Sequence, residues 1–97
     1  MRFYSRIEIV ELLEVEPGFL DALEREEIIL SDASSGAAGG FSERMLERVR
    51  VAYNLVHDLD VNLAGVAIII QMREDMSSLR HQIEGLLNEL KGSSTDR

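Results

Sequence analysis

The residues best suited to acid–base or metal chemistry in this chain are two histidines and two adjacent carboxylate pairs. His57 and His81 lie far apart in the sequence with no partner motif around either, which is typical of surface or interface histidines. The pairs Glu26–Glu27 and Glu74–Asp75 fall in predicted helices, where the side chains of adjacent residues point apart. Neither pair therefore predicts a shared catalytic or metal-binding role.

The glycine-rich stretch "GAAGG", Gly36 to Gly40, is the segment most similar to a phosphate-binding loop. It lacks the Lys-Ser/Thr ending of such a loop and the spacing of a dinucleotide-binding fingerprint, so it predicts a flexible turn. The chain also contains no Cys, which excludes a disulfide framework and cysteine metal sites. We therefore expect a protein that is not an enzyme and that uses no cofactor and no metal.

The charge of the chain is concentrated in one window. Between Glu8 and Asp32 every charged residue except Arg25 is acidic, and this window alone accounts for the formal net charge of −8. An acidic surface repels phosphate and attracts basic partners. The same surface could simply keep the protein in solution, and charge alone leaves both interpretations open.

The length and composition favour a small domain that gains stability from a second copy. A chain of 97 residues forms one small domain, and an aromatic content of 5% with no Trp leaves few large core residues. The N-terminus lacks the layout of a signal peptide, and the apolar run Val66–Ile70 is too short for a membrane span. We therefore expect a cytoplasmic protein.

The first forty residues predict two short helices and a small hairpin. Ser5–Leu13 has the spacing of a first helix, and Pro17 suits the first turn of a second helix that runs to about Glu27. Ile28–Leu30 then favours a short strand, and Ser31–Gly40 is typical of a loop or hairpin tip.

A third helix follows Phe41. Ser42 is a good N-cap, and Phe41 with Leu46 occupies the positions of a hydrophobic staple. The helix is expected to end at Asp60–Asn62. Its predicted apolar face consists of Met45, Val49, Ala52, Val56 and Leu59.

The last helix begins after Asn62, a second good N-cap, with Val61 and Val66 placed as another staple. The run Ile68–Ile70 has strand propensity, but a helical pattern continues far beyond it and outweighs that local preference. The pattern predicts a coiled-coil seam that pairs with the same helix of a second subunit, with burial inside one chain as the alternative. The seam residues are Ile69, Met72, Met76, Leu79, Ile83, Leu86 and Leu90.

The order of these elements resembles the winged-helix module of MerR-type proteins. Two stretches carry the resemblance, "IEIVELLEVEPGFLDALEREEII" over residues 7–29 and "FSERMLERVRVAYNLVHDLDVNLAGV" over residues 41–66. The "NLAGV" wording is similar to the heat-shock repressor HspR and to its relative, the chaperone modulator CbpM. The resemblance implies a mainly α, winged helix-turn-helix fold with a minimal β-wing. A winged-helix domain over residues 1–60, a dimerisation helix over 61–91 and a disordered tail over 92–97 would follow.

DNA-binding MerR-type proteins carry Arg and Lys on the second helix and the wing. Here Arg25 is the one base among the acids of the second helix, and Ser31–Gly40 contains no Arg or Lys. The basic residues of the third helix alternate with acids, which predicts a salt-bridged face rather than a DNA surface. The acids are Glu43 and Glu47, and the basic residues are Arg44, Arg48 and Arg50.

Resemblance to CbpM implies that the chain binds the J-domain of a DnaJ-like co-chaperone and inhibits it. An acidic second helix complements a basic J-domain helix, with charge setting orientation and apolar contacts setting affinity. The alternatives are a DNA-binding transcriptional regulator of the HspR or MerR type and a dimerisation module for another protein. The residues expected to face the J-domain are Glu16, Asp21, Glu24, Glu26 and Glu27.

Overall fold

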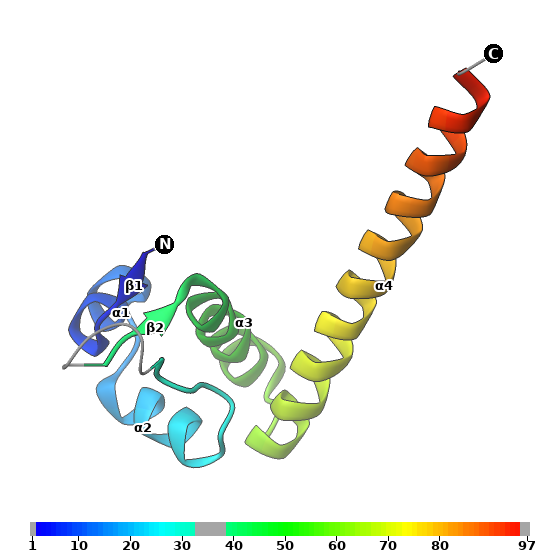
Figure 1. Cartoon of the computed structure of the whole chain (residues 1–97). Helices are drawn as coiled ribbons and strands as arrows, with labels where there is room; N and C mark the ends of the chain where they lie inside the picture. Colours follow the sequence, from blue (N-terminus) through cyan, green and yellow to red (C-terminus); the bar gives the residue numbers. More distant parts are fainter. Residues whose placement is uncertain (1, 33–38, 96–97) are drawn as a thin grey trace. The chain divides into compact units, whose positions relative to one another are not determined.

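The computed structural model describes residues 2–32 and 39–95, and it divides into two compact units, residues 1–67 and 68–97. The architecture is mainly helical with one small sheet and a long C-terminal helix (Figure 1). The elements in chain order are β1 (Phe3–Tyr4), α1 (Arg6–Leu13), α2 (Pro17–Arg25), β2 (Phe41–Ser42), α3 (Glu43–Leu59) and α4 (Leu63–Thr95).

Helix α1 starts with a complete capping box. The Ser5 hydroxyl accepts a hydrogen bond from the Glu8 amide at 3.1 Å, and the Glu8 carboxylate accepts one from the Ser5 amide at 3.0 Å. Two amides that have no helical partner are thereby satisfied by side chains. The predicted first helix is confirmed, and Ile9 is its buried residue.

Helix α2 begins at Pro17 as predicted but ends at Arg25, and the predicted strand over Ile28–Leu30 is wrong. After Arg25 the chain turns back on the helix. The Ile28 amide donates to the Leu23 carbonyl at 2.9 Å, and Glu27 adopts a left-handed conformation with φ 57°. This is a Schellman motif, in which the amides beyond the helix bond to its last carbonyls.

The turn explains why strand propensity misleads at this point. Ile28 and Ile29 are 3% and 0% exposed, whereas successive residues of a half-buried strand alternate between core and solvent. Arg48 of α3 donates to the Ile28 carbonyl at 2.9 Å and so satisfies that group without a strand partner. The turn places both adjacent isoleucines in the core, which a half-buried strand would not do.

The sheet joins the N-terminus to the residues before α3. Strands β1 and β2 are antiparallel, with Phe3 opposite Ser42 and Tyr4 opposite Phe41. An antiparallel bridge also pairs Asp32 with Gly40, as expected for the ends of a hairpin. Most of the predicted loop, residues 33–38, lies outside the described residues.

Helix α3 is capped by Ser42, whose hydroxyl accepts from the Met45 amide at 3.3 Å. Its predicted apolar face is buried at Val49 and Ala52, but Leu59 is 68% exposed at the helix end. Asp60 ends the helix in a left-handed conformation, which confirms the predicted break. The core of the first unit consists of Tyr4, Ile9, Val15, Leu20, Leu23, Ile28, Ile29, Phe41, Val49, Ala52 and Val66.

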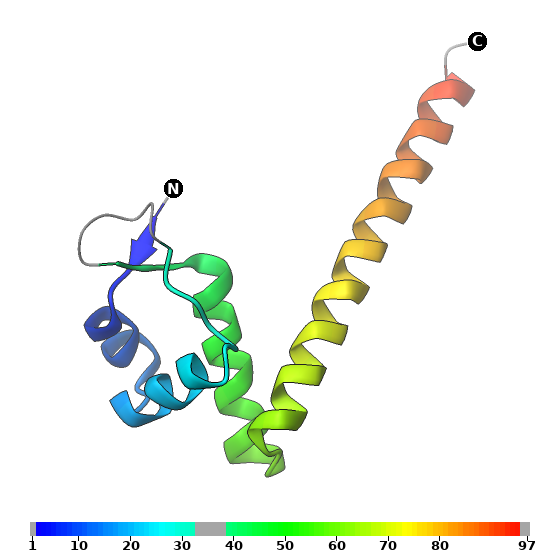
Figure 2. The same cartoon turned by 60° about the horizontal axis from the view of Figure 1, so that its bottom comes forward.

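Helix α4 runs without a break from Leu63 to Thr95 (Figure 2). The Asn62 side-chain oxygen accepts from the Gly65 amide at 2.8 Å, so the predicted N-cap is confirmed, and the isoleucine run is helical. Val66 and Ile70 are buried while Ile68 is 62% exposed, so the apolar run is buried only in part. The helix extends to Thr95, past the predicted end at residue 91, and residues 96–97 lie outside the described part.

Candidate protein-binding surface

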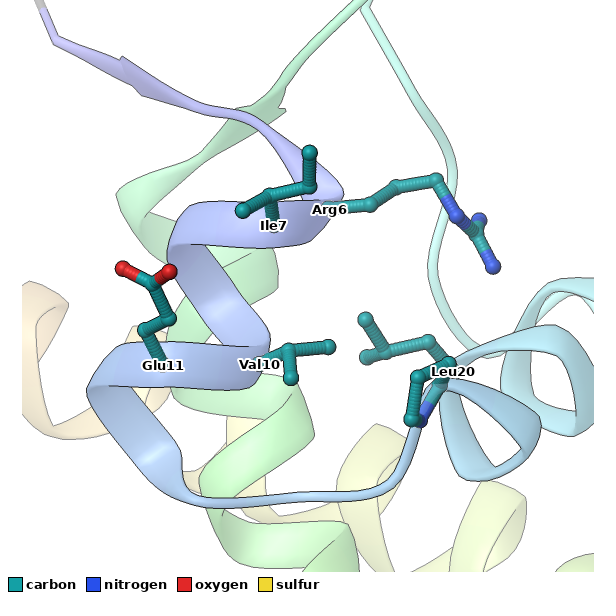
Figure 3. A pocket seen from close by; sticks show the side chains of 6 residues that line it. Arg6, Ile7, Val10, Glu11 and Leu20 are labelled. Carbon is teal, nitrogen blue, oxygen red and sulfur yellow. The ribbon is translucent and has the colours of Figure 1, made fainter.

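An apolar hollow lies between α1 and α2 in the first unit (Figure 3). Val10 of α1 and Leu20 of α2 face each other across it, and Ile7, which is 71% exposed, stands beside it. Arg6, Glu11 and Pro17 complete the lining of a space of about 310 Å³. The hollow can take an apolar side chain, and it has charged groups at its edge.

Arg6 divides the five predicted partner-binding acids into two groups. Its guanidinium group forms ion pairs with Asp21 and with Glu24 on α2. Both acids therefore belong to an α1–α2 contact, and the acidic surface of α2 is weaker than the sequence indicated. Arg6 precedes the acidic window, so a charge count along the chain does not reveal this pairing.

The other three acids occupy the two ends of α2. Glu16 is its N-cap residue and makes no capping hydrogen bond with its side chain, and Glu26 and Glu27 lie in the exposed turn after Arg25. Nine helical residues separate these ends by roughly 14 Å. Among the described residues none of the three has an ion-pair partner, so of the five predicted acids these three remain available to a basic partner.

The basic residues of α3 interact with other groups of the same chain. Arg50 donates to the Glu47 carboxylate at 3.1 Å, which confirms part of the predicted salt-bridged face and raises the pKa of Arg50. Arg48 holds the Ile28 carbonyl, and Arg44 also has an interaction partner. Glu43 differs from the prediction, since it accepts a hydrogen bond from the Tyr4 hydroxyl at 3.3 Å.

A second hollow, of about 330 Å³, lies between the α1–α2 turn, α2 and α3. Tyr53 and His57 are stacked with ring centroids 4.0 Å apart, and Phe19 meets each of them edge-on. Glu14, Glu16 and Val56 complete the lining. A surface position for His57 was predicted from the sequence. The packing of Phe19 against Tyr53 and His57 was not predicted. The one local signal was the spacing of Tyr53 and His57, which are neighbours on a helix surface.

The seven predicted seam residues lie on α4, and in the single chain all are exposed, from 36% at Ile69 to 65% at Leu90. They follow one another at heptad spacing, which places them on one side of the helix. Leu87, also exposed, lies next to this row. The row is an apolar face of the kind that a second helix covers, and pairing remains a prediction.

The fold and these surfaces define the class of protein. Two short helices joined by a turn, a small antiparallel sheet, a third helix and a long last helix form a winged helix-turn-helix domain with an extended C-terminal helix. The family model described as MerR HTH family regulatory protein matches residues 4–88, and the chain belongs to this family. This confirms the predicted fold class and the MerR-type resemblance.

The match includes both hollows, the acids of α2 and the seam residues up to Leu86. No curated protein and no solved structure matched the chain. Within the described residues, no helix is both long and apolar enough to cross a membrane.

Proposed function

We propose that this MerR-family protein is a non-enzymatic chaperone modulator of the CbpM type. It binds the J-domain of a DnaJ-like co-chaperone and thereby inhibits that co-chaperone. The observation that carries the proposal is the charge of α2, the helix on which DNA-binding MerR-type proteins carry basic residues. Here the exposed residues that flank the helix, Glu16, Glu26 and Glu27, are negative, and Arg25 in its last turn is the one base beside them.

The surface of α1 and α2 combines two kinds of contact. Its unpaired acids attract and orient a basic helix, which raises the rate of association. The apolar hollow supplies area that is buried on binding, from Ile7 and Val10, which keep accessible surface. Asp21 and Glu24 contribute less than the sequence indicated, because Arg6 already pairs with both.

The proposed assembly is a homodimer held by α4. The helix from residue 71 onward has no buried residue among those whose exposure is described, and a single helix of this kind is marginal in water. Pairing of the seven seam residues with those of a second chain would cover the exposed apolar row.

The proposal is tested by isothermal titration calorimetry with the J-domain of the co-chaperone at two salt concentrations. Reversal of charge in Glu26→Lys/Glu27→Lys is expected to weaken binding roughly tenfold and to reduce its salt dependence. The matched control is Asp58→Lys/Glu84→Lys, which changes the net charge equally at exposed positions of α3 and α4. Unchanged binding by the first variant, or binding insensitive to salt, would contradict the electrostatic role of α2.

A transcriptional regulator of the HspR or MerR type is the second candidate, because the family description is that of a helix-turn-helix regulator. It requires a DNA surface, and the described Arg residues of α3 contact protein groups instead. A mobility-shift assay with promoter DNA distinguishes the two functions. Sub-micromolar binding to a pseudo-palindromic site would favour the regulator.

A further inference from the structure

The hollow that contains the aromatic rings has the composition of a site for an organic cation. Phe19, Tyr53 and His57 supply ring surfaces, and Glu14 and Glu16 supply two carboxylates. Cations are attracted to the faces of aromatic rings, and a neighbouring carboxylate adds direct charge complementarity. The hollow between α1 and α2 differs in composition, because its lining contains no aromatic ring and a single acid, Glu11.

Both carboxylates are positioned by the turn between α1 and α2. Val15, between them, is 3% exposed and fixes the turn to the core of the first unit. Glu14 ends α1 in a left-handed conformation, and Glu16 begins α2 in an extended one. The turn thus holds two acids at one hollow while the residue between them is buried.

The two carboxylates of this hollow are not matched by a Lys or Arg of the described chain. No Lys or Arg is among the residues that line this hollow, and neither Glu14 nor Glu16 has an ion-pair partner within the described chain. The first hollow differs, because Arg6 is one of the residues that line it. Arg6 also pairs with Asp21 and Glu24 of α2. Two unpaired carboxylates beside three rings leave a place for a cation from outside the chain.

We propose that this hollow binds the guanidinium group of an arginine side chain presented by a protein partner. A guanidinium group is planar, so it stacks on a ring while its N–H groups donate to carboxylates, and a lysine ammonium group cannot do both in this way. A space of about 330 Å³ accommodates the end of one such side chain. The nature of the partner rests on the proposed function, whereas the cation site itself does not.

The test uses the full-length chain and a small probe, N-acetyl-argininamide, titrated while the ring resonances of Tyr53 and Phe19 are followed by NMR. Saturable shifts in the millimolar range are expected, since one side chain supplies little binding energy. The uncharged isostere N-acetyl-citrullinamide should produce no saturable shift. Equal shifts with both probes, or no saturation with the arginine probe, would overturn the proposal.

Variants assign the shifts to the hollow. Tyr53→Leu and Glu14→Gln/Glu16→Gln are each expected to bind the probe at least roughly fivefold more weakly. Glu84→Gln on α4 is the matched control and should bind as the parent chain does. The double glutamine variant changes exposed residues only, so it carries the test if Tyr53→Leu fails to fold. Parent-like binding by the double variant would contradict the assignment.

The probe and the J-domain separate this inference from the proposed function. Probe binding without J-domain binding supports the cation site and contradicts the proposed function. J-domain binding without probe binding supports the proposed function and contradicts the cation site.

Discussion

Glu8 shows how one exposed side chain makes the stability of this protein depend on pH. The Ser5 amide donates to its carboxylate, and this hydrogen bond is the main cause that holds the pKa of Glu8 below its ordinary value of 4.5. The Arg2 guanidinium group, 3.1 Å from the carboxylate, acts in the same direction. Because the folded pKa is the lower one, the contribution of Glu8 is complete above pH 4.5 and is lost as the pH falls through the folded pKa.

We therefore expect Glu8→Gln to flatten the fall in stability on the acid side. The measurement is the free energy of unfolding in urea at several values between about pH 5 and about pH 3. Glu84→Gln on α4 removes a carboxylate that caps no helix, and it should retain the parent slope more closely. A parent-like slope in the Glu8 variant would show that the capping box does not carry this dependence.

Glu14 is held in a left-handed conformation, with φ 54°, that favours glycine. Glu14→Gly removes this strain, and we expect it to raise the free energy of unfolding by up to about 1 kcal/mol. Glu11→Gly, in the body of α1, should lower it by about 1 kcal/mol. Urea unfolding of both variants gives the comparison. A destabilised Glu14 variant would mean that the carboxylate contributes more to the fold than its strain costs.

At the scale of the helices, two glycines of α4 have opposite expected effects. A Cβ at Gly65 would lie 2.8 Å from Val61 Cγ1 and 3.3 Å from the capping oxygen of Asn62, whereas a Cβ at Gly85 meets nothing within 4 Å. Gly85→Ala should therefore stabilise the helix by about 1 kcal/mol, as alanine does in an open helix position. Gly65→Ala should lose stability, because the new methyl group displaces Val61 or the cap.

Thermal unfolding followed by circular dichroism measures both changes in the same helix. Equal stabilisation by the two alanines would show that the N-terminal cap of α4 tolerates the methyl group. The contrast also gives a structural reason for the glycine in the "NLAGV" segment, since it leaves room for the preceding valine and asparagine.

The helices could be predicted from sequence because their signals are local. Ser5, Ser42 and Asn62 are capping residues next to periodic apolar positions, and the structure uses all three as caps. The strand prediction at Ile28–Leu30 failed because the end of α2 is set by a turn and by Arg48, a residue of another helix. Strand β1, two residues long, has too little sequence to show a pattern.

The candidate site was less predictable, because it too depends on contacts between different helices. Acidic composition was visible in the sequence, but the pairing of Arg6 with Asp21 and Glu24 depends on how α1 and α2 pack. The ring cluster likewise needs Phe19 from α2 beside Tyr53 and His57 from α3. Residues brought together by packing leave no spacing that a reader of the sequence can recognise.

At the scale of the whole molecule, the exposed row on α4 predicts the oligomeric state. Ile83, the fifth of the seven seam residues, is 49% exposed in the single chain. We expect the parent chain to sediment as a dimer and Ile83→Glu to sediment as a monomer, because a charge at the seam is costly to bury. Asn88→Glu introduces the same side chain away from the seam and should remain dimeric. A monomeric parent at high micromolar concentration would contradict seam pairing.

Tyr53 also gives the molecule an internal optical reporter. The chain contains two tyrosines and no tryptophan, so its intrinsic ultraviolet emission arises from Tyr4 and Tyr53 without transfer to an indole ring. Tyr4 is buried under the Arg2 side chain, whereas Tyr53 lies beside His57 at the hollow. A change in the environment of that hollow should therefore alter the tyrosine fluorescence of the unlabelled protein. Binding at the hollow can then be followed by fluorescence without an attached dye.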